Sequence, residues 1–192
     1  VLKSLRAKDG RVRYLSFSRN FGKEAAMLAG LRMAKGDYTA VMDADLQHPP
    51  EMLIEMYDAV KGGEYDCAAA RRTDREGETA VRSGGSKLFS KLMNALSETE
   101  YVPGATDYRL MRRGMVDAVL SLPEYNRFTK GIFSWVGFKT KWIPYVSRDR
   151  AAGTTKWSFM KLVRYSIDGM MAFSTKPLAI SSILGVISCA IA

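Results

Sequence analysis

The amino-acid sequence predicts an α/β fold in which helices flank an open, mostly parallel sheet. First, strand-like and helix-like patterns alternate along the first part of the chain. Second, 47% hydrophobic and 26% charged residues are typical of a globular protein. Third, 192 residues are enough for one domain with an appendage, at roughly 100 to 200 residues per domain. These values exclude a disulfide-stapled miniprotein, a wholly disordered chain and a polytopic membrane protein.

Five segments alternate between strand and helix in the first half. The strands are short apolar runs, whereas the helices carry apolar residues at helical spacing and end at glycine. In chain order they are strand Val12–Phe17, helix Asn20–Lys35, strand Tyr38–Met42, helix Glu51–Lys61 and strand Tyr65–Ala70. This order predicts parallel strands joined by right-handed crossovers, with the ligand site beyond the carboxyl ends of the strands.

A highly charged loop, Arg71–Thr79, separates this part from the second half. There we expect a helix over Ser86–Leu96, whose leucines recur at every fourth position. A strand over Thr106–Met111 follows, and then short helices alternate with the segment Phe138–Val146.

The C-terminal part combines an amphipathic segment with an uncharged one. Lys156–Phe173 predicts a helix with an apolar stripe and a basic face, which suits a membrane interface or, equally, packing on the domain core. Leu178–Ala192 carries no charge but is shorter than the roughly 20 residues that span a bilayer. We interpret it as the start of a transmembrane segment cut off by the end of the chain, with a buried terminal helix as the alternative. The predicted boundaries are 1–155 for the main domain, 156–176 for the juxtamembrane helix and 177–192 for the start of the transmembrane segment.

Charge and composition narrow the classes of partner. The 29 Lys and Arg against 20 Asp and Glu give a net charge of +9, which favours a phosphate-bearing or anionic partner. A nucleic-acid-binding module is one alternative, but no aromatic-interleaved basic stripe or reader motif is present, so we expect no nucleic-acid partner. The single histidine, His48, excludes a multi-histidine zinc site and is more often structural. Since Cys67 and Cys189 form no CxxC pair, any metal would bind oxygen ligands.

Two carboxylates follow the predicted strand Tyr38–Met42 directly. Asp43 and Asp45 stand two residues apart at its carboxyl end, so an extended chain points them to the same side. Carboxylates at this spacing can share one Mg²⁺ or Mn²⁺, which would then bridge to diphosphate oxygens. The alternative is a solvated pair in a turn.

Several ordered motifs give the sequence a family resemblance. It resembles the family 2 glycosyltransferases that use polyprenyl phosphate acceptors, a group that includes dolichol-phosphate mannosyltransferases and bacterial bactoprenol glucosyltransferases. The matching motifs are RNFGK at 19–23, AGL at 29–31, GD at 36–37, DADLQHPPE at 43–51, DYRL at 107–110, GIFSWVGF at 131–138, and Arg150, Gly153, Thr155 and Lys156. The resemblance implies a GT-A (Rossmann-like) fold with a mostly parallel sheet.

The resemblance also implies a metal site and two catalytic residues. Asp43 and Asp45 correspond to the acidic pair that meets Mg²⁺ or Mn²⁺ and the sugar-nucleotide diphosphate, and Gln47 to a further metal ligand. Asp107 corresponds to an acceptor-side carboxylate, either a general base or an orienting group, with a turn carboxylate as the alternative. Asp45 and Asp107 are therefore the predicted catalytic residues.

The predicted phosphate-binding residues lie mainly in the second half. By resemblance, Arg150 and Lys156 bind the donor diphosphate, whereas Arg72, Arg82 and Ser86 bind the acceptor phosphate. Arginine suits this role because its planar guanidinium donates two parallel hydrogen bonds to phosphate oxygens. For the loop after residue 70, a solvated charged segment is the alternative.

The function implied is metal-dependent, inverting transfer of a hexose from a nucleoside diphosphate sugar to a polyprenyl (undecaprenyl or dolichyl) phosphate at the cytoplasmic membrane face. A soluble-type transferase acting on a polysaccharide or protein is the alternative, and homo-oligomers occur among such anchored enzymes.

The family's opening strand and V-P-x-Y-N-E-type segment have no match before Val12, so we expect the nucleotide-base segment to be missing. Arg19 and Lys23 belong to a matching motif, but Lys23 fits an exposed helical turn equally well, so neither is predicted to be catalytic.

Overall fold

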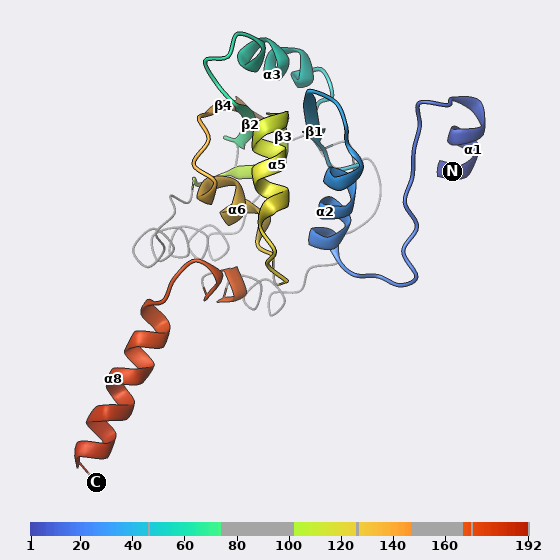
Figure 1. The fold of residues 1–192 in the computed structure, drawn as a ribbon. Helices are drawn as coiled ribbons and strands as arrows, with labels where there is room; N and C mark the ends of the chain where they lie inside the picture. The colour runs from blue at the N-terminus through green and yellow to red at the C-terminus, as the bar shows by residue number, and fades with distance from the viewer. Residues whose placement is uncertain (46, 74–101, 126, 147–166, 170, 192) are drawn as a thin grey trace.

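The computed structural model describes residues 1–45, 47–73, 102–125, 127–146, 167–169 and 171–191. Within these residues, four strands form one sheet in the order β1-β3-β2-β4. The strands are β1 (Tyr38–Val41), β2 (Cys67–Arg72), β3 (Ala105–Arg112) and β4 (Thr140–Tyr145). Figure 1 shows the sheet with the helices around it.

The described sheet is mixed: β1, β2 and β4 run in one direction, as predicted, whereas the prediction did not include a strand that runs against them. Strand β3 runs antiparallel to both of its neighbours, β1 and β2, whereas β2 and β4 are parallel. The chain leaves β2 and re-enters the sheet at the same edge, where Arg71 pairs with Ala105, so β3 must run back in the opposite direction. As a result, the carboxyl ends of β1, β2 and β4 share one edge of the sheet with the amino end of β3.

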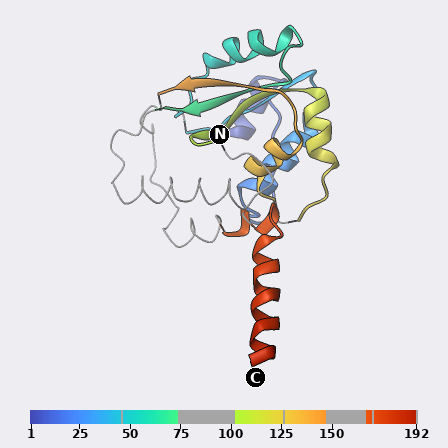
Figure 2. The same cartoon turned by 90° about the vertical axis from the view of Figure 1, so that its left-hand side faces the viewer.

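Helices cover both faces of this sheet. Helices α2 (Lys23–Met33), α5 (Arg113–Ser121) and α6 (Thr129–Trp135) cover one face, and α3 (Met52–Lys61) covers the other. Figure 2 shows α3 above the sheet and α2 and α6 below it. Successive side chains of a strand point to opposite faces, so Cys67 and Ala69 join the first core while Ala68 and Ala70 join the second.

Most predicted elements are confirmed where the chain is described. The helices expected over Asn20–Lys35 and Glu51–Lys61 correspond to α2 and α3, and the strands expected over Tyr38–Met42, Tyr65–Ala70 and Thr106–Met111 correspond to β1, β2 and β3. Strand β4 lies within Phe138–Val146. The helix expected over Ser86–Leu96 lies outside the described residues, as does most of Lys156–Phe173.

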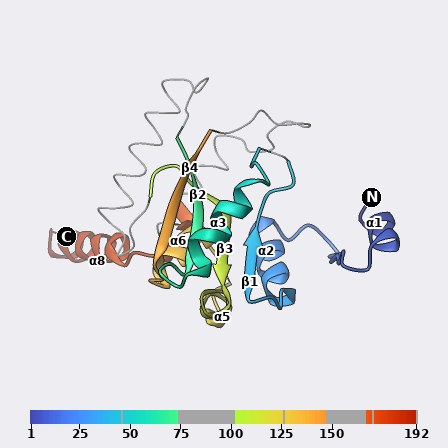
Figure 3. The same cartoon turned by 90° about the horizontal axis from the view of Figure 1, so that it is seen from above.

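The strand predicted over Val12–Phe17 is not formed. These residues have no regular secondary structure and pair with no strand of the described sheet. Their large side chains Tyr14, Leu15 and Phe17 are exposed. The segment and helix α1 (Leu2–Lys8) lie to the side of the sheet in Figure 3. An apolar alternation becomes a strand only when a neighbouring strand takes its backbone hydrogen bonds, and none of the four described strands does so.

The C-terminal helix α8 (Lys176–Ile191) extends away from the domain in Figures 1 and 2. Its apolar side chains are exposed, so the alternative of a buried terminal helix is wrong. In the described part of the chain, every helix is too short or too polar to cross a membrane. Just before α8, the Phe173 ring lies 6.0 Å from Trp135 and 6.3 Å from Phe128, which attaches the start of α8 to α6.

Candidate active site

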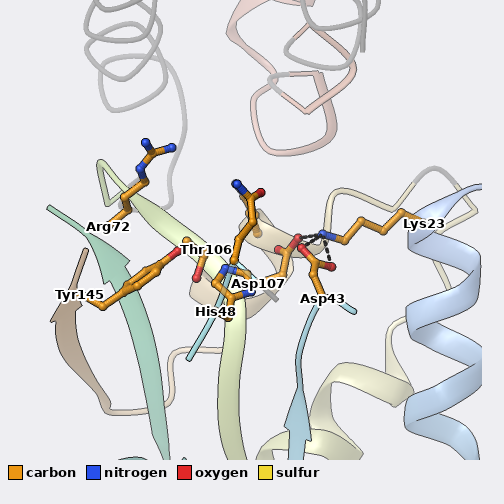
Figure 4. A pocket seen from close by; sticks show the side chains of 9 residues that line it. Lys23, Asp43, His48, Arg72, Thr106, Asp107 and Tyr145 are labelled. Carbon is orange, nitrogen blue, oxygen red and sulfur yellow. Dashed lines mark hydrogen bonds and ion pairs between the residues drawn. The ribbon is translucent and has the colours of Figure 1, made fainter. Parts of the chain in front are cut away.

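A cavity of about 200 Å³ opens at the sheet edge where β1 ends and β3 begins. The two strands meet here because Val41 pairs with Arg109, which brings Asp43 and Asp107 to the same edge. Figure 4 shows side chains from α2 and from several strand ends converging on this cavity. The lining residues are Lys23, Asp43, Gln47, His48, Arg72, Thr106, Asp107, Lys130 and Tyr145.

A glycine turn positions Arg72 at the cavity. The backbone N–H of Arg72 donates to the Gly104 carbonyl at 2.9 Å, which joins the end of β2 to the start of β3. Gly104 has φ +79°, and a Cβ there would lie 2.5 Å from the Arg72 carbonyl oxygen. Only glycine fits this close approach without strain. Arg72 is also the register partner of Tyr145 on β4, so both side chains reach the same cavity.

Lys23 connects the two predicted carboxylates. Its ammonium lies 3.1 Å from an Asp43 oxygen and 2.6 Å from an Asp107 oxygen, as the dashed lines in Figure 4 mark. Burial alone would lower the pKa of Lys23, but Asp107 and Asp43 together raise it above its ordinary value. Lys23 stays charged at neutral pH and balances two carboxylates that are far apart in sequence. The prediction left Lys23 out because α2 could equally have been turned to expose it.

Asp107 lies deeper than Asp43 and is surrounded by positive charge. Its side chain is 11% exposed, compared with 40% for Asp43. Burial alone would raise the pKa of Asp107, but Lys130, Lys23 and Arg109 together hold it below its ordinary value. A carboxylate with a lowered pKa remains ionised and is a weak proton acceptor.

Arg109 supports this end of β3 from inside the core. Its side chain is 3% exposed, and the guanidinium lies 3.6 Å from the centroid of the Phe133 ring. Its Nη2 donates to the Thr106 carbonyl at 3.0 Å, next to Asp107 in the chain. A buried guanidinium is stabilised by a nearby negative charge, so Asp107 and Arg109 compensate each other electrostatically.

The predicted metal ligands form a turn after β1. The backbone N–H of Gln47 donates to Asp45 Oδ1 at 3.2 Å. Asp43 and Gln47 line the cavity, whereas Asp45 is not among the lining residues. Among the described residues, no group of three or more His, Cys, Asp or Glu side chains is close enough to hold a metal ion. The predicted set has two carboxylates and one amide, which are oxygen donors of the kind that Mg²⁺ accepts. The ammonium group of Lys23 lies between Asp43 and Asp107, which is consistent with a site that attracts positive charge.

His48 is buried beside the cavity between two tyrosines. Its ring stacks on Tyr108 with centroids 5.0 Å apart and lies 5.6 Å from the Tyr145 ring. The Tyr108 hydroxyl donates to the Pro49 carbonyl at 2.9 Å, which attaches this loop to β3. Burial lowers the pKa of His48, although Asp43 and Asp45 partly oppose this effect. Its packing agrees with the structural role predicted from sequence, but its place in the cavity lining was not predicted.

A hydrogen-bonded pair links α2 to α6 near Asp107. Glu24 Oε2 accepts from the Thr129 backbone N–H at 3.1 Å and also from the Thr129 hydroxyl. Glu24 follows Lys23 in the chain, and Thr129 precedes Lys130. One contact therefore sets the relative positions of the two helix starts that carry these lysines.

The cavity thus brings together four of the predicted site residues: Asp43, Gln47, Arg72 and Asp107. Arg82, Ser86, Arg150 and Lys156 lie outside the described residues. Five lining residues were not predicted as site residues: Lys23, His48, Thr106, Lys130 and Tyr145. Lys23 and His48 lie within quoted motifs, and Thr106 and Lys130 each adjoin one, whereas Tyr145 belongs to no quoted motif.

Comparison with known proteins gives a consistent family match. The model of glycosyl transferase family 2 matches residues 1–120. A putative glycosyltransferase, CsbB, of Bacillus subtilis is 45% identical over 185 residues, which are 96% of this chain and 56% of the relative. A prophage bactoprenol glucosyl transferase homolog of Escherichia coli is 38% identical over 192 residues, covering 100% of this chain and 62% of the relative. The bactoprenol glucosyl transferase of Shigella phage SfV is 38% identical over 185 residues, covering 96% and 60%. The chain therefore spans somewhat more than half the length of these relatives.

Proposed function

The chain belongs to glycosyl transferase family 2, and from this we propose that the protein transfers a hexose from a nucleoside diphosphate sugar to a polyprenyl phosphate. The observation that carries the proposal is the convergence of Asp43 and Asp107 on one cavity. A donor-side and an acceptor-side carboxylate must lie this close if one sugar passes between two phosphate-bearing substrates. The names of the relatives from Escherichia coli and phage SfV support a bactoprenol-type acceptor.

On the donor side, Asp43 and Asp45, with Gln47, would hold Mg²⁺ or Mn²⁺. Such an ion supplies charge neutralisation for the departing nucleoside diphosphate. The remaining donor contacts proposed from sequence are Arg150 and Lys156. Asp45 belongs to this set through its place in the turn beside Asp43.

On the acceptor side, we assign Asp107 an orienting role rather than that of a general base. Its lowered pKa makes it a weak base, and a phosphate acceptor is already an anion near neutral pH. In the reaction, an acceptor phosphate oxygen forms the bond to the anomeric carbon, while the bond from that carbon to the diphosphate breaks and its electron pair leaves with the nucleotide. Arg72 would bind the acceptor phosphate with its planar guanidinium, together with Arg82 and Ser86. Inversion at the anomeric carbon is part of the proposal by resemblance to the family.

We place this reaction at the cytoplasmic face of a membrane. The exposed apolar side chains of α8 and the net charge of +9 suit a surface that offers both acyl chains and anionic headgroups. The link between Phe173 and α6 would then hold the cavity close to the headgroups that carry the acceptor phosphate.

The test uses the full-length protein in detergent with undecaprenyl phosphate, Mg²⁺ or Mn²⁺, and a panel of radiolabelled nucleotide sugars. Label should enter the organic phase with one donor and should disappear with EDTA or with the variant Asp45→Ala. Asp58→Ala is the matched control, because Asp58 is exposed on α3 and is not among the cavity-lining residues. If no donor labels the lipid while metal-dependent nucleotide-sugar binding persists, the lipid acceptor is wrong and a polysaccharide or protein acceptor takes its place.

A further inference from the structure

The two lysines that line the cavity differ in what their ammonium groups contact. Lys23 is committed to Asp43 and Asp107 by ion pairs of 3.1 and 2.6 Å. In the described part of the chain, no hydrogen bond or ion pair engages the ammonium of half-buried Lys130. Its charge nevertheless acts on Asp107, because it is the largest contribution that lowers the pKa of that carboxyl against burial. Lys130 therefore brings to the cavity a positive charge that no carboxylate of the described residues holds in an ion pair.

The fold holds Lys130 at this place through its neighbour in the chain. Thr129 donates its backbone N–H and its hydroxyl to Glu24, which follows Lys23 on α2. Thr129 is 2% exposed, so this contact is shielded from water. The starts of α2 and α6 are thereby joined, and the two lysines reach Asp107 from different helices.

An anion that approaches Asp107 needs a compensating cation because the carboxylate repels it. Lys23 already balances Asp107 and also Asp43 on the donor side. Lys130 acts on the deeper of the two carboxylates, the one assigned to the acceptor. Among the described cavity residues, this makes it the lysine suited to an incoming phosphate on that side.

We propose that Lys130 binds the acceptor phosphate that reacts beside Asp107. This assignment deepens the proposed function and rests on it. A phosphate group could also come from the donor diphosphate, so the experiment separates the two sources.

Steady-state kinetics of the full-length protein test whether Lys130 binds the acceptor phosphate or the donor diphosphate. Lys130→Met should raise the KM for undecaprenyl phosphate by about tenfold or more, as expected for the loss of one contact between a charged donor and a phosphate. The KM for the nucleotide sugar should stay unchanged, and Lys130→Arg should recover most of the acceptor affinity. Lys35→Met is the matched control, since Lys35 is exposed and absent from the cavity lining. A rise in the donor KM alone, or no change in either KM, would overturn the assignment.

A binding measurement keeps this test independent of turnover. Titration of farnesyl phosphate in the absence of donor should show weaker binding to Lys130→Met than to the unmodified protein and to Lys35→Met. Equal affinities, or no binding of farnesyl phosphate to the unmodified protein, would overturn the role of Lys130. If farnesyl phosphate binds in a Lys130-dependent way but no sugar reaches lipid, the phosphate site stands and the proposed transfer reaction fails.

Discussion

Asp43 and Asp107, the two carboxylates of the cavity, share one lysine but lie in different surroundings. Asp43 is on a loop after β1, is 40% exposed, and has Lys23 as its ion-pair partner among the described residues. Asp107 is on β3, is 11% exposed, and has Lys23, Lys130 and Arg109 acting on its charge. Asp43 is therefore the more accessible of the two carboxylates to solvent. Asp107 is built into the domain, and its charge supports the fold as well as the site.

The largest expected effect comes from removing the exposed carboxylate. Asp43→Asn should lower the transfer rate by about 100-fold or more, the size expected when a group that supports developing charge is lost. The free energy of unfolding should change by less than about 1 kcal/mol, because water screens a half-exposed ion pair. Initial rates of lipid labelling and urea denaturation measure the two quantities.

The control for this variant is Asp117→Asn, which removes an exposed carboxylate on α5 that pairs with Arg113 at 3.4 Å. It should leave the rate unchanged. Equal rates for Asp43→Asn and the unmodified protein would contradict the donor-side role of Asp43.

The buried carboxylate should affect stability as well as activity. Asp107→Asn should lower the free energy of unfolding by about 1–3 kcal/mol, because it leaves buried Arg109 without its compensating charge. Since the pKa of Asp107 is lowered in the folded state, its contribution is complete above the unfolded value of about 3.9 and is lost as the pH falls through the folded value. The difference in unfolding free energy between the unmodified protein and Asp107→Asn should therefore be constant from about pH 7 to about pH 5 and shrink below about pH 4.

Urea denaturation at a series of pH values checks this dependence. Asp43→Asn serves as the comparison, because its stability difference should stay small throughout. A stability difference for Asp107→Asn that grows as the pH falls would contradict the assigned direction of the pKa shift.

The smallest effect concerns how Lys23 divides its interaction between the two carboxylates. Double-mutant cycles with Lys23→Met should give a larger coupling energy with Asp107→Asn than with Asp43→Asn. The contact with Asp107 is shorter, at 2.6 Å against 3.1 Å, and its carboxylate is less exposed. Both values should remain near or below about 1 kcal/mol because the Lys23 side chain is itself 45% exposed. Equal coupling energies would show that the deeper position of Asp107 has no energetic consequence.

The sequence by itself determined the strand and helix segments that depend on local spacing. Helices α2 and α3 and strands β1, β2 and β3 appear where periodicity predicted them, and Asp43 follows β1 at the predicted strand end. The family resemblance of the motif at 107–110, rather than local spacing, predicted that Asp107 belongs to the site. The helix and strand segments depend on neighbouring residues, and a one-dimensional pattern contains that information.

Only the tertiary structure decided the strand order and the interaction partners of each charged side chain. Strand β3 lies antiparallel between β1 and β2, whereas residues 12–17 pair with none of the described strands. Both outcomes depend on pairing between segments that are distant in the chain. Lys23 lies between Asp43 and Asp107 because of the way α2 is turned against the sheet, and Lys130 reaches the site because Thr129 binds Glu24. Such contacts join residues far apart in the chain, so no local spacing could indicate them.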